Sequence, residues 1–187
     1  MGQRDTNQTV VVAGVTGAIG HAAASRFVAE GWKVIGLSRR APLRPVPEGE
    51  GRFVHVPLDL TDADACHRAA AAMADATHLV FAALFEKPGL IPGWRAPDQM
   101  ETNRLMLVNL LDGMGAGGNQ TGLRHISLLQ GTKAYGAHVE PMLVPGRERD
   151  PRHEHENFYW LQEDELRDRQ AGAPWTSTIL RPQVVYG

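Results

Sequence analysis

Short apolar runs alternate with stretches of helical periodicity along the whole chain. The apolar runs are short and rich in β-branched residues, which is typical of buried strands. We predict strands at residues 9–13, 33–37, 53–56, 79–84, 123–129 and 176–180. The stretches between them repeat apolar residues at helical spacing. We predict helices at residues 18–30, 61–73, 98–114 and 157–170.

The connections between these elements carry turn and helix-stop residues. Gly31 follows the first predicted helix, and a glycine cluster at 115–118 follows the third. Residues 41–51 and the polar stretch up to His155 are rich in Pro, Gly and charge, so we predict exposed loops there. Strands that alternate with helices over short connections require parallel pairing. The predicted fold is therefore α/β, a doubly wound parallel sheet of the Rossmann type.

Composition narrows the range of functions. The 187 residues are 43% hydrophobic and 21% charged with a net charge of −2, which argues against disorder and against a nucleic-acid-binding surface. No stretch is apolar and long enough to cross a membrane, and residues 1–9 lack the apolar run of a secretion signal. The one cysteine, Cys66, has no disulfide partner within the chain and reads as a small core residue. We expect a cytoplasmic protein without nucleic-acid or membrane partners; a homodimer is compatible with the sequence, which does not fix the oligomeric state.

A glycine-rich loop joins the first strand to the first helix. Residues 14–20 read GVTGAIG, a GxxGxxG spacing. Gly14 permits a tight turn, Gly17 lets a pyrophosphate approach the backbone, and Gly20 lets the helix pack closely on the strand. Free N–H groups and the helix dipole favour an anion here. A lone glycine motif is weak evidence, but its strand–loop–helix context predicts a dinucleotide site.

Two arginines follow the second strand, where NAD-preferring folds usually carry an acid. Ser38, Arg39 and Arg40 occupy this position. Because guanidinium groups bind a 2′-phosphate in bidentate fashion, we predict NADPH rather than NADH. The alternative is a pair of solvated surface arginines.

An acidic residue follows the third strand. Asp59, next to Leu60, is expected to meet the adenine amine, or else to cap the helix that we predict to start near Thr61. Both roles are compatible.

Three later segments carry a family resemblance. Residues 125–136 read HISLLQGTKAYG, residues 157–164 read NFYWLQED, and residues 180–187 read LRPQVVYG. Together with the glycine loop they resemble the extended short-chain dehydrogenase/reductases, and in particular the progesterone 5β-reductase/iridoid synthase-like group. The sequence lacks the Tyr-x-x-x-Lys pair of most of that superfamily, since Val139 follows Tyr135 and Glu163 follows Tyr159 at that spacing. Trp160 stands where the group commonly has a second tyrosine.

The resemblance implies NADPH-dependent 1,4-reduction of an enone, a small carbonyl substrate. Tyr159 would be the catalytic phenol that stabilises the enolate, and Lys133 its partner. The alternatives are a tyrosine that packs on the sheet and a solvated lysine. The predicted cofactor-binding residues are Gly14, Thr16, Gly17, Ala18, Ile19, Gly20, Ser38, Arg39, Arg40, Asp59, Leu60, Ala82, Ala83, Ser127, Lys133, Tyr159, Pro182 and Val184.

Other chemistry is less well supported. His153 and His155 alternate with glutamates, but no second cluster completes a metal site, so we predict none. Trp94 lies on the side where substrates usually bind and is a candidate pocket residue. Trp32 and Trp175 are expected to pack at the end of the sheet. A nucleotide-sugar epimerase or dehydratase and a non-catalytic NADPH-binding regulator are the alternative functions.

The resemblance also implies a longer chain whose C-terminal part closes over the substrate. We expect residues 1–187 to form the NADP-binding Rossmann domain of a truncated extended reductase, with the substrate-binding part largely absent. Whether this is a natural short form or part of a longer chain is left open by the sequence. Without a lid to exclude water, we expect weak or absent turnover from these residues alone.

Overall fold

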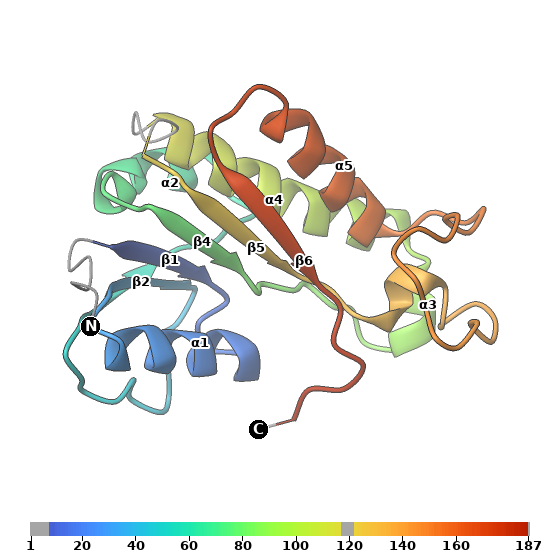
Figure 1. The fold of residues 1–187 in the computed structure, drawn as a ribbon, viewed down its shortest axis with the longest axis horizontal. Helices are drawn as coiled ribbons and strands as arrows, with labels where there is room; N and C mark the ends of the chain where they lie inside the picture. Colours follow the sequence, from blue (N-terminus) through green and yellow to red (C-terminus); the bar gives the residue numbers. More distant parts are fainter. Residues whose placement is uncertain (1–7, 117–121, 187) are drawn as a thin grey trace.

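A parallel six-stranded sheet forms the centre of the computed structural model, which describes residues 8–116 and 122–186 (Figure 1). The strand order is β3-β2-β1-β4-β5-β6, and every neighbouring pair is parallel. The strands are β1 (Thr9–Ala13), β2 (Lys33–Ser38), β3 (Arg52–Pro57), β4 (His78–Phe81), β5 (His125–Leu129) and β6 (Thr176–Leu180). The order reverses between β1 and β4, the switch point at which doubly wound sheets bind ligands.

Helices cover both faces of this sheet (Figure 1). On one face lies α1 (Ala18–Ala29). The other face carries α2 (Ala63–Arg68), the 3-10 turn η1 (Ala70–Met73), α4 (Pro97–Ala116) and α5 (Phe158–Gln170). Two short elements, α3 (Leu90–Trp94) and the 3-10 turn η3 (Thr132–Tyr135), lie beyond the carboxyl ends of the strands. None of the helices in the described part of the chain is long and apolar enough to span a membrane.

Alternation along the strands divides the core in two. In β1, Val10 and Val12 pack in the cluster beneath α1, whereas Val11 and Ala13 join the larger cluster beneath α2, α4 and α5. All four are fully buried, because a central parallel strand is covered on both faces. The free thiol of Cys66 is also fully buried in the larger cluster, and burial raises its pKa to about 11. Its predicted place in the core is confirmed.

The predicted fold class is confirmed, but several element boundaries differ. The helix predicted at 61–73 is two pieces, because Ala70 and Met73, three residues apart, enter the core from the 3-10 turn η1. The strand predicted at 79–84 ends at Phe81. The amide of Asn103 on α4 binds both the N–H and the C=O of Phe85, at 2.9 and 2.7 Å, and draws this segment away from the sheet.

Other predicted features agree in part. The predicted helix at 98–114 extends to Pro97–Ala116, whereas α3 and η3 were not predicted at all. Glycines 117 and 118, expected to end α4, lie outside the described residues. Trp175 is buried at the amino end of β6, and Trp32 packs on Phe27 and His78 beside β2, as expected for the end of the sheet.

Candidate functional site: a dinucleotide cleft beside a tyrosine–lysine pair

The glycine loop is held against the carboxyl ends of β2 and β4. The N–H groups of Gly14 and Val15 both donate to the carbonyl oxygen of Leu37, at 2.9 and 3.2 Å. Gly14 has a φ of +82°, and a Cβ atom there would lie 2.7 Å from the carbonyl oxygen of Ala82. A Cβ atom on Gly20 would clash with the carbonyl group of Gly14. Both glycines are therefore required by close backbone packing, as their spacing predicts.

The first turn of α1 leaves its N–H groups without a side-chain cap. Gly17 is the N-cap residue and offers no side chain, and this turn contains no acid. By contrast, Asp62 caps α2 by accepting from Ala65 N–H at 2.8 Å, and Asn157 caps α5 by accepting from Tyr159 N–H at 3.0 Å. An uncapped helix start that faces a cavity suits an anion, because the exposed N–H groups and the helix dipole both favour negative charge.

A cavity of about 250 Å³ lies over this loop at the carboxyl edge of the sheet. It contains the residues expected around a nucleoside and its pyrophosphate. Its lining is Gly14, Thr16, Gly17, Leu37, Ser38, Arg39, Leu58, Asp59, Leu60, Thr61, Ala82, Ala83, Leu84, Phe85 and Met106. A second hollow of about 700 Å³ shares Thr16, Gly17 and Arg39 with the first and continues around the start of α1.

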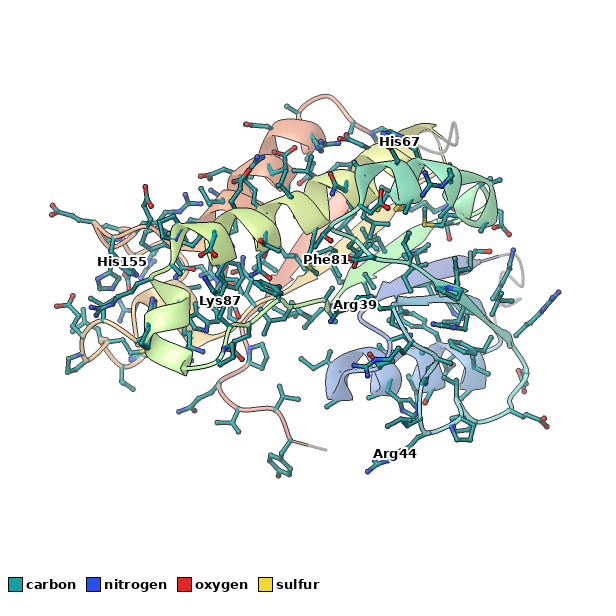
Figure 2. All side chains as sticks on the ribbon, turned by 180° about the vertical axis from the view of Figure 1, so that it is seen from behind. Arg39, Arg44, His67, Phe81, Lys87 and His155 are labelled. Carbon is teal, nitrogen blue, oxygen red and sulfur yellow. The ribbon has the colours of Figure 1, made fainter. Side chains whose placement is uncertain are left out.

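The second hollow is basic. Arg39, Arg40 and Arg44 line it together with His21 of α1, whose Nε2 lies 3.2 Å from the carbonyl oxygen of Arg44. Arg39 and Arg40 are exposed. Figure 2 shows Arg39 near the middle of the molecule and Arg44 at its margin, beside α1. Ser38 does not face a ligand freely, because its hydroxyl donates to the Arg40 carbonyl oxygen at 2.7 Å and so fixes the turn that presents the arginines.

Asp59 lines the cavity but does not cap a helix. Its Oδ1 accepts from both the N–H and the hydroxyl of Thr61, at 3.0 and 2.8 Å, while Asp62 caps α2. The alternative prediction that Asp59 caps this helix is therefore wrong, and Asp62 is the capping residue. The two Thr61 hydrogen bonds, followed by the charge of Arg39, hold the pKa of Asp59 below its usual range. The carboxylate is thus ionised and can accept a hydrogen bond from a ligand amine.

Tyr159 and Lys133 come together beyond the ends of β5 and β6. Tyr159 lies in the first turn of α5, and Lys133 lies in η3. Asn157 joins the two elements, because its amide donates to the carbonyl oxygen of Lys133 at 2.7 Å while its oxygen caps the helix at Tyr159. The backbone of Tyr159 is tied in turn to the end of β5, since Gln130 Nε2 donates to its carbonyl oxygen at 2.9 Å.

The side chains of this pair meet on one indole ring. The ammonium of Lys133 lies 4.0 Å from the ring centre of Trp94, and the ring of Tyr159 packs edge-on to the same indole at 5.1 Å. Trp94 is only 2% exposed, and its N–H donates to a carboxylate oxygen of Glu86 at 2.6 Å. We call these four side chains the indole cluster: Glu86, Trp94, Lys133 and Tyr159. Trp94 was considered a pocket residue; it is instead the buried support of the pair.

Burial sets the protonation of the pair. Desolvation, with a smaller contribution from the Glu86 charge, raises the pKa of the Tyr159 phenol, so this side chain is a hydrogen-bond donor at neutral pH. Desolvation lowers the pKa of Lys133, and the Glu86 carboxylate opposes that change. Tyr159 therefore presents a protonated phenol, the kind of donor that stabilises a developing oxyanion, on the same indole that Lys133 contacts.

A buried carboxylate fixes α5 from the other side. Glu163 is 1% exposed and accepts from Arg152 and Arg167 at 3.3 and 3.2 Å, and it also pairs with Arg181. Arg181 follows β6 and also donates to the Gln130 oxygen at 3.2 Å. Because Gln130 also binds the Tyr159 carbonyl group, this network sets the position of the first turn of α5.

The structure gathers many, though not all, of the predicted cofactor residues around the two hollows. Ala18 and Arg40 line the second, and the residues named above line the first. The remaining seven lie elsewhere, among them Gly20, Lys133 and Tyr159 as described above. Ser127 is in the middle of β5, paired with Val80 and Thr178, and Val184 is 72% exposed after β6. The carbonyl oxygen of Pro182 and the hydroxyl of Tyr159 flank Gly131, at 3.5 and 3.6 Å from the position that a Cβ atom would take there. Ile19 lies in the uncapped first turn of α1.

Sequence reasoning missed Glu86, Gln130 and the charge network around Glu163. Only the local context of Glu86, an acid shortly after the fourth strand, was available from the sequence. The paired histidines that were set aside as metal ligands have other contacts: His153 Nδ1 lies 3.0 Å from Glu140, and His155 packs against Trp160. No group of side chains in the described ranges has the geometry of a metal site.

Comparison with known families and proteins agrees with this architecture. The sequence profile of the NAD dependent epimerase/dehydratase family matches residues 10–187. The chain is similar to the (S)-8-oxocitronellyl enol synthases of Camptotheca acuminata (CYC2) and Antirrhinum majus, at 28% identity over 98% and 100% of its length. It covers 48% of each of these relatives, so the chain spans about half of their length.

Solved structures show the same fold. The UDP-glucose 4-epimerase of Bifidobacterium longum, determined in complex with NAD+ and UDP, superposes with a TM-score of 0.72 at 22% identity, over 93% of this chain and 52% of that one. Another UDP-glucose 4-epimerase superposes with a TM-score of 0.74 at 17% identity, over 96% and 53% of the two chains.

Proposed function

Since this chain belongs to the NAD dependent epimerase/dehydratase family, we propose that it binds NADPH and reduces the carbon–carbon double bond of an enone, with Tyr159 and Lys133 as the catalytic pair. The observation that carries the proposal is that both side chains contact the ring of Trp94, beyond the carboxyl ends of the strands. The sequence lacks the usual Tyr-x-x-x-Lys pair, and here a lysine from η3 takes the place of the one missing from the helix.

The cleft fits a dinucleotide. The glycine loop has no room for a Cβ atom at Gly14 or Gly20, and the first turn of α1 has no side-chain cap. The adjoining cavity has an apolar lining around Leu58, Leu60 and Met106. In our proposal the uncapped turn binds the pyrophosphate, and Asp59 accepts from the adenine amine. The basic second hollow supports NADPH over NADH, because Arg39 and Arg40 meet a 2′-phosphate with charge-assisted hydrogen bonds.

The proposed roles of Tyr159 and Lys133 follow from where negative charge develops during the reaction. NADPH held in this cleft would supply the hydride that reduces the β-carbon of the enone. The electron pair of the double bond then moves to the carbonyl oxygen and gives an enolate. The Tyr159 O–H donates a hydrogen bond to that oxygen, and the Lys133 ammonium strengthens the donor. A proton from the phenol or from water completes an enol.

The relatives support this direction of the reaction. Two proteins that resemble the chain over nearly its whole length are named enol synthases, and an enol is what hydride addition to a conjugated carbonyl compound forms. A second candidate function is a nucleotide-sugar epimerase, favoured by the family profile and by the fold of the UDP-glucose 4-epimerases. Its weakness is the missing Tyr-x-x-x-Lys pair.

In either case a reducing compartment suits the buried free thiol of Cys66, and we propose the cytoplasm.

A cofactor-consumption screen tests the proposal. NADPH or NADH is mixed with a small cyclic enone, the matching saturated ketone, or a UDP-sugar, and coenzyme absorbance and products are followed. We expect NADPH oxidation with the enone and formation of its saturated product. Epimerised UDP-sugar in place of enone reduction would favour the second candidate. NADPH binding without turnover of any compound would indicate a non-catalytic regulator.

A further inference from the structure

At the centre of the indole cluster is a hydrogen bond between Trp94 and Glu86, to which the proposed reaction assigns no role. Trp94 belongs to α3, and its N–H donates to Glu86 in the loop after β4, at 2.6 Å. On the same indole lie the Lys133 ammonium at 4.0 Å and the Tyr159 ring at 5.1 Å. Phe158 packs on it at 4.5 Å, and the buried ring has little freedom to move. One indole therefore holds a carboxylate, an ammonium and a phenol in fixed relation.

We propose that Glu86, anchored by the indole N–H of Trp94, is the counter-ion of Lys133 and a positioning residue for the Tyr159–Lys133 pair. Glu86 acts through Lys133 and Trp94 and need not touch the substrate. The inference deepens the proposed function and rests on it for its catalytic meaning, whereas the electrostatic claim concerns Glu86 and Lys133 alone.

The charges around Lys133 show why a counter-ion is needed. Burial lowers the pKa of Lys133, and Glu86 is the acid that raises it again. Across the indole lies His138, whose ring centre is 5.6 Å from that of Trp94. Burial, followed by the charges of His155, Lys133 and Arg95, lowers the pKa of His138 to about 4, so this ring is neutral at pH 7. Arg95 adds positive charge to the same region. Glu86 is thus the carboxylate in the described residues whose charge opposes the effect of burial on Lys133.

A counter-ion role for Glu86 has a consequence for how activity falls at alkaline pH. A lysine that has lost its proton no longer strengthens the Tyr159 donor, so activity should fall as Lys133 deprotonates. Removing the Glu86 charge should move that fall to lower pH. A purely structural role for Glu86 would lower the rate at every pH without moving the profile.

Direct titration of Lys133 is the decisive experiment. Besides Lys133, the sequence contains only Lys33 and Lys87, which pair with Asp75 and Asp98. Reductive methylation with carbon-13 therefore gives few lysine resonances, which NMR can follow against pH. The Glu86→Gln variant keeps an oxygen acceptor for the indole N–H and removes only the charge. Glu30→Gln is the matched control, because Glu30 ends α1 and pairs with Arg26, away from the cluster.

We expect Glu86→Gln to lower the pKa of Lys133 by about one unit, the size of effect that a neighbouring opposite charge produces. Glu30→Gln should leave it unchanged. Trp94→Phe, which keeps an aromatic ring and loses the N–H anchor, should lower it by a smaller amount. An unchanged Lys133 titration in Glu86→Gln, or an equal shift in Glu30→Gln, would overturn the inference. If Trp94→Phe does not fold, Glu86→Gln decides alone.

The same variants separate this inference from the proposed function. The lysine titration needs neither cofactor nor substrate, so it stands even if no enone is reduced. If enone reduction is found, its alkaline limit should move to lower pH by the same amount in Glu86→Gln. A profile that keeps its position while Lys133 shifts would show that Lys133, and hence Glu86, does not govern the reaction.

Discussion

Arg39 and Arg40 directly follow β2, at the position where dinucleotide folds that prefer NAD usually carry an acid. Both side chains are exposed beside the glycine loop, and the Ser38 hydroxyl fixes their turn through the Arg40 carbonyl oxygen. Exposed arginines without a ligand contribute little to folding, so their removal is informative about binding. Neither arginine is needed for the core, which lies beneath α1 and α4.

Replacing both arginines by alanine should weaken NADPH binding by about 10²- to 10⁴-fold, since two charge-assisted hydrogen bonds of roughly 1.5–3 kcal/mol each are lost. NADH binding should change little, because NADH lacks the 2′-phosphate. Fluorescence titration with both coenzymes measures the two affinities. An equal loss of affinity for NADPH and NADH would show that the arginines contribute to dinucleotide binding in general. Unchanged NADPH affinity would show that they are solvated surface residues.

The start of α5 is the element on which the site depends most. Its cap residue, Asn157, is 1% exposed and makes two different hydrogen bonds, one to the helix N–H of Tyr159 and one to the carbonyl oxygen of Lys133. The cap stabilises the helix, whereas the second bond sets the distance between η3 and α5. Two substitutions can therefore separate stability from alignment.

Asn157→Ala should lose both bonds and destabilise the fold by about 1–3 kcal/mol, the cost of a lost cap together with an unsatisfied buried carbonyl group. Asn157→Ser keeps a side-chain oxygen for the cap and loses the amide donor to Lys133, without burying a charge. Denaturant unfolding and enone turnover should be measured for both. We expect Ser to retain more stability than Ala while turnover falls in both; full turnover in Asn157→Ser would contradict the alignment role.

Local pattern predicted the long elements well and the short ones poorly. The strands β1, β2, β5 and β6 lie where β-branched runs lie, because a buried parallel strand leaves that trace in the sequence. The short helix α3 contains Pro92 and Gly93, which resemble a turn, and it is held by the tertiary packing of Trp94. The early end of β4 depends on Asn103, which is distant in sequence and gives no local signal.

The candidate site divides in the same way. The glycine loop and the arginines were predictable because a contiguous segment performs each task. The indole cluster was not, since Glu86, Trp94, Lys133 and Tyr159 come from separate segments that only the fold brings together. The arginines that surround Glu163 likewise come from a loop, from α5 and from the end of β6.

For the whole molecule, the loop between η3 and α5 makes stability depend on pH. His138 lies in this loop, and both of its ring nitrogens are buried without a hydrogen-bond partner among the described residues. Its pKa is lowered from 6.5 to about 4, mainly by burial. The unfolded chain therefore binds more protons than the folded one between these values, and folding stability falls as the pH drops from about 6.5 toward 4.

His138→Gln should remove part of this acid sensitivity. Denaturant midpoints measured at neutral pH and near pH 5 should differ less in the variant than in the parent protein. His67, exposed on α2, provides a control through His67→Gln, which should leave the difference as it is. An acid sensitivity that persists unchanged in His138→Gln would place its origin elsewhere.

In the proposed reaction, the Tyr159 phenol stabilises an enolate formed by hydride from NADPH. Single-turnover oxidation of bound NADPH by a small cyclic enone, compared between the parent protein and Tyr159→Phe, tests it most directly. We expect the rate to be lower by a factor of about 10²–10³ in the variant, the usual cost of losing one oxyanion donor, with NADPH affinity nearly unchanged. A Tyr159→Phe protein that binds NADPH and reduces the enone at the parent rate would contradict it.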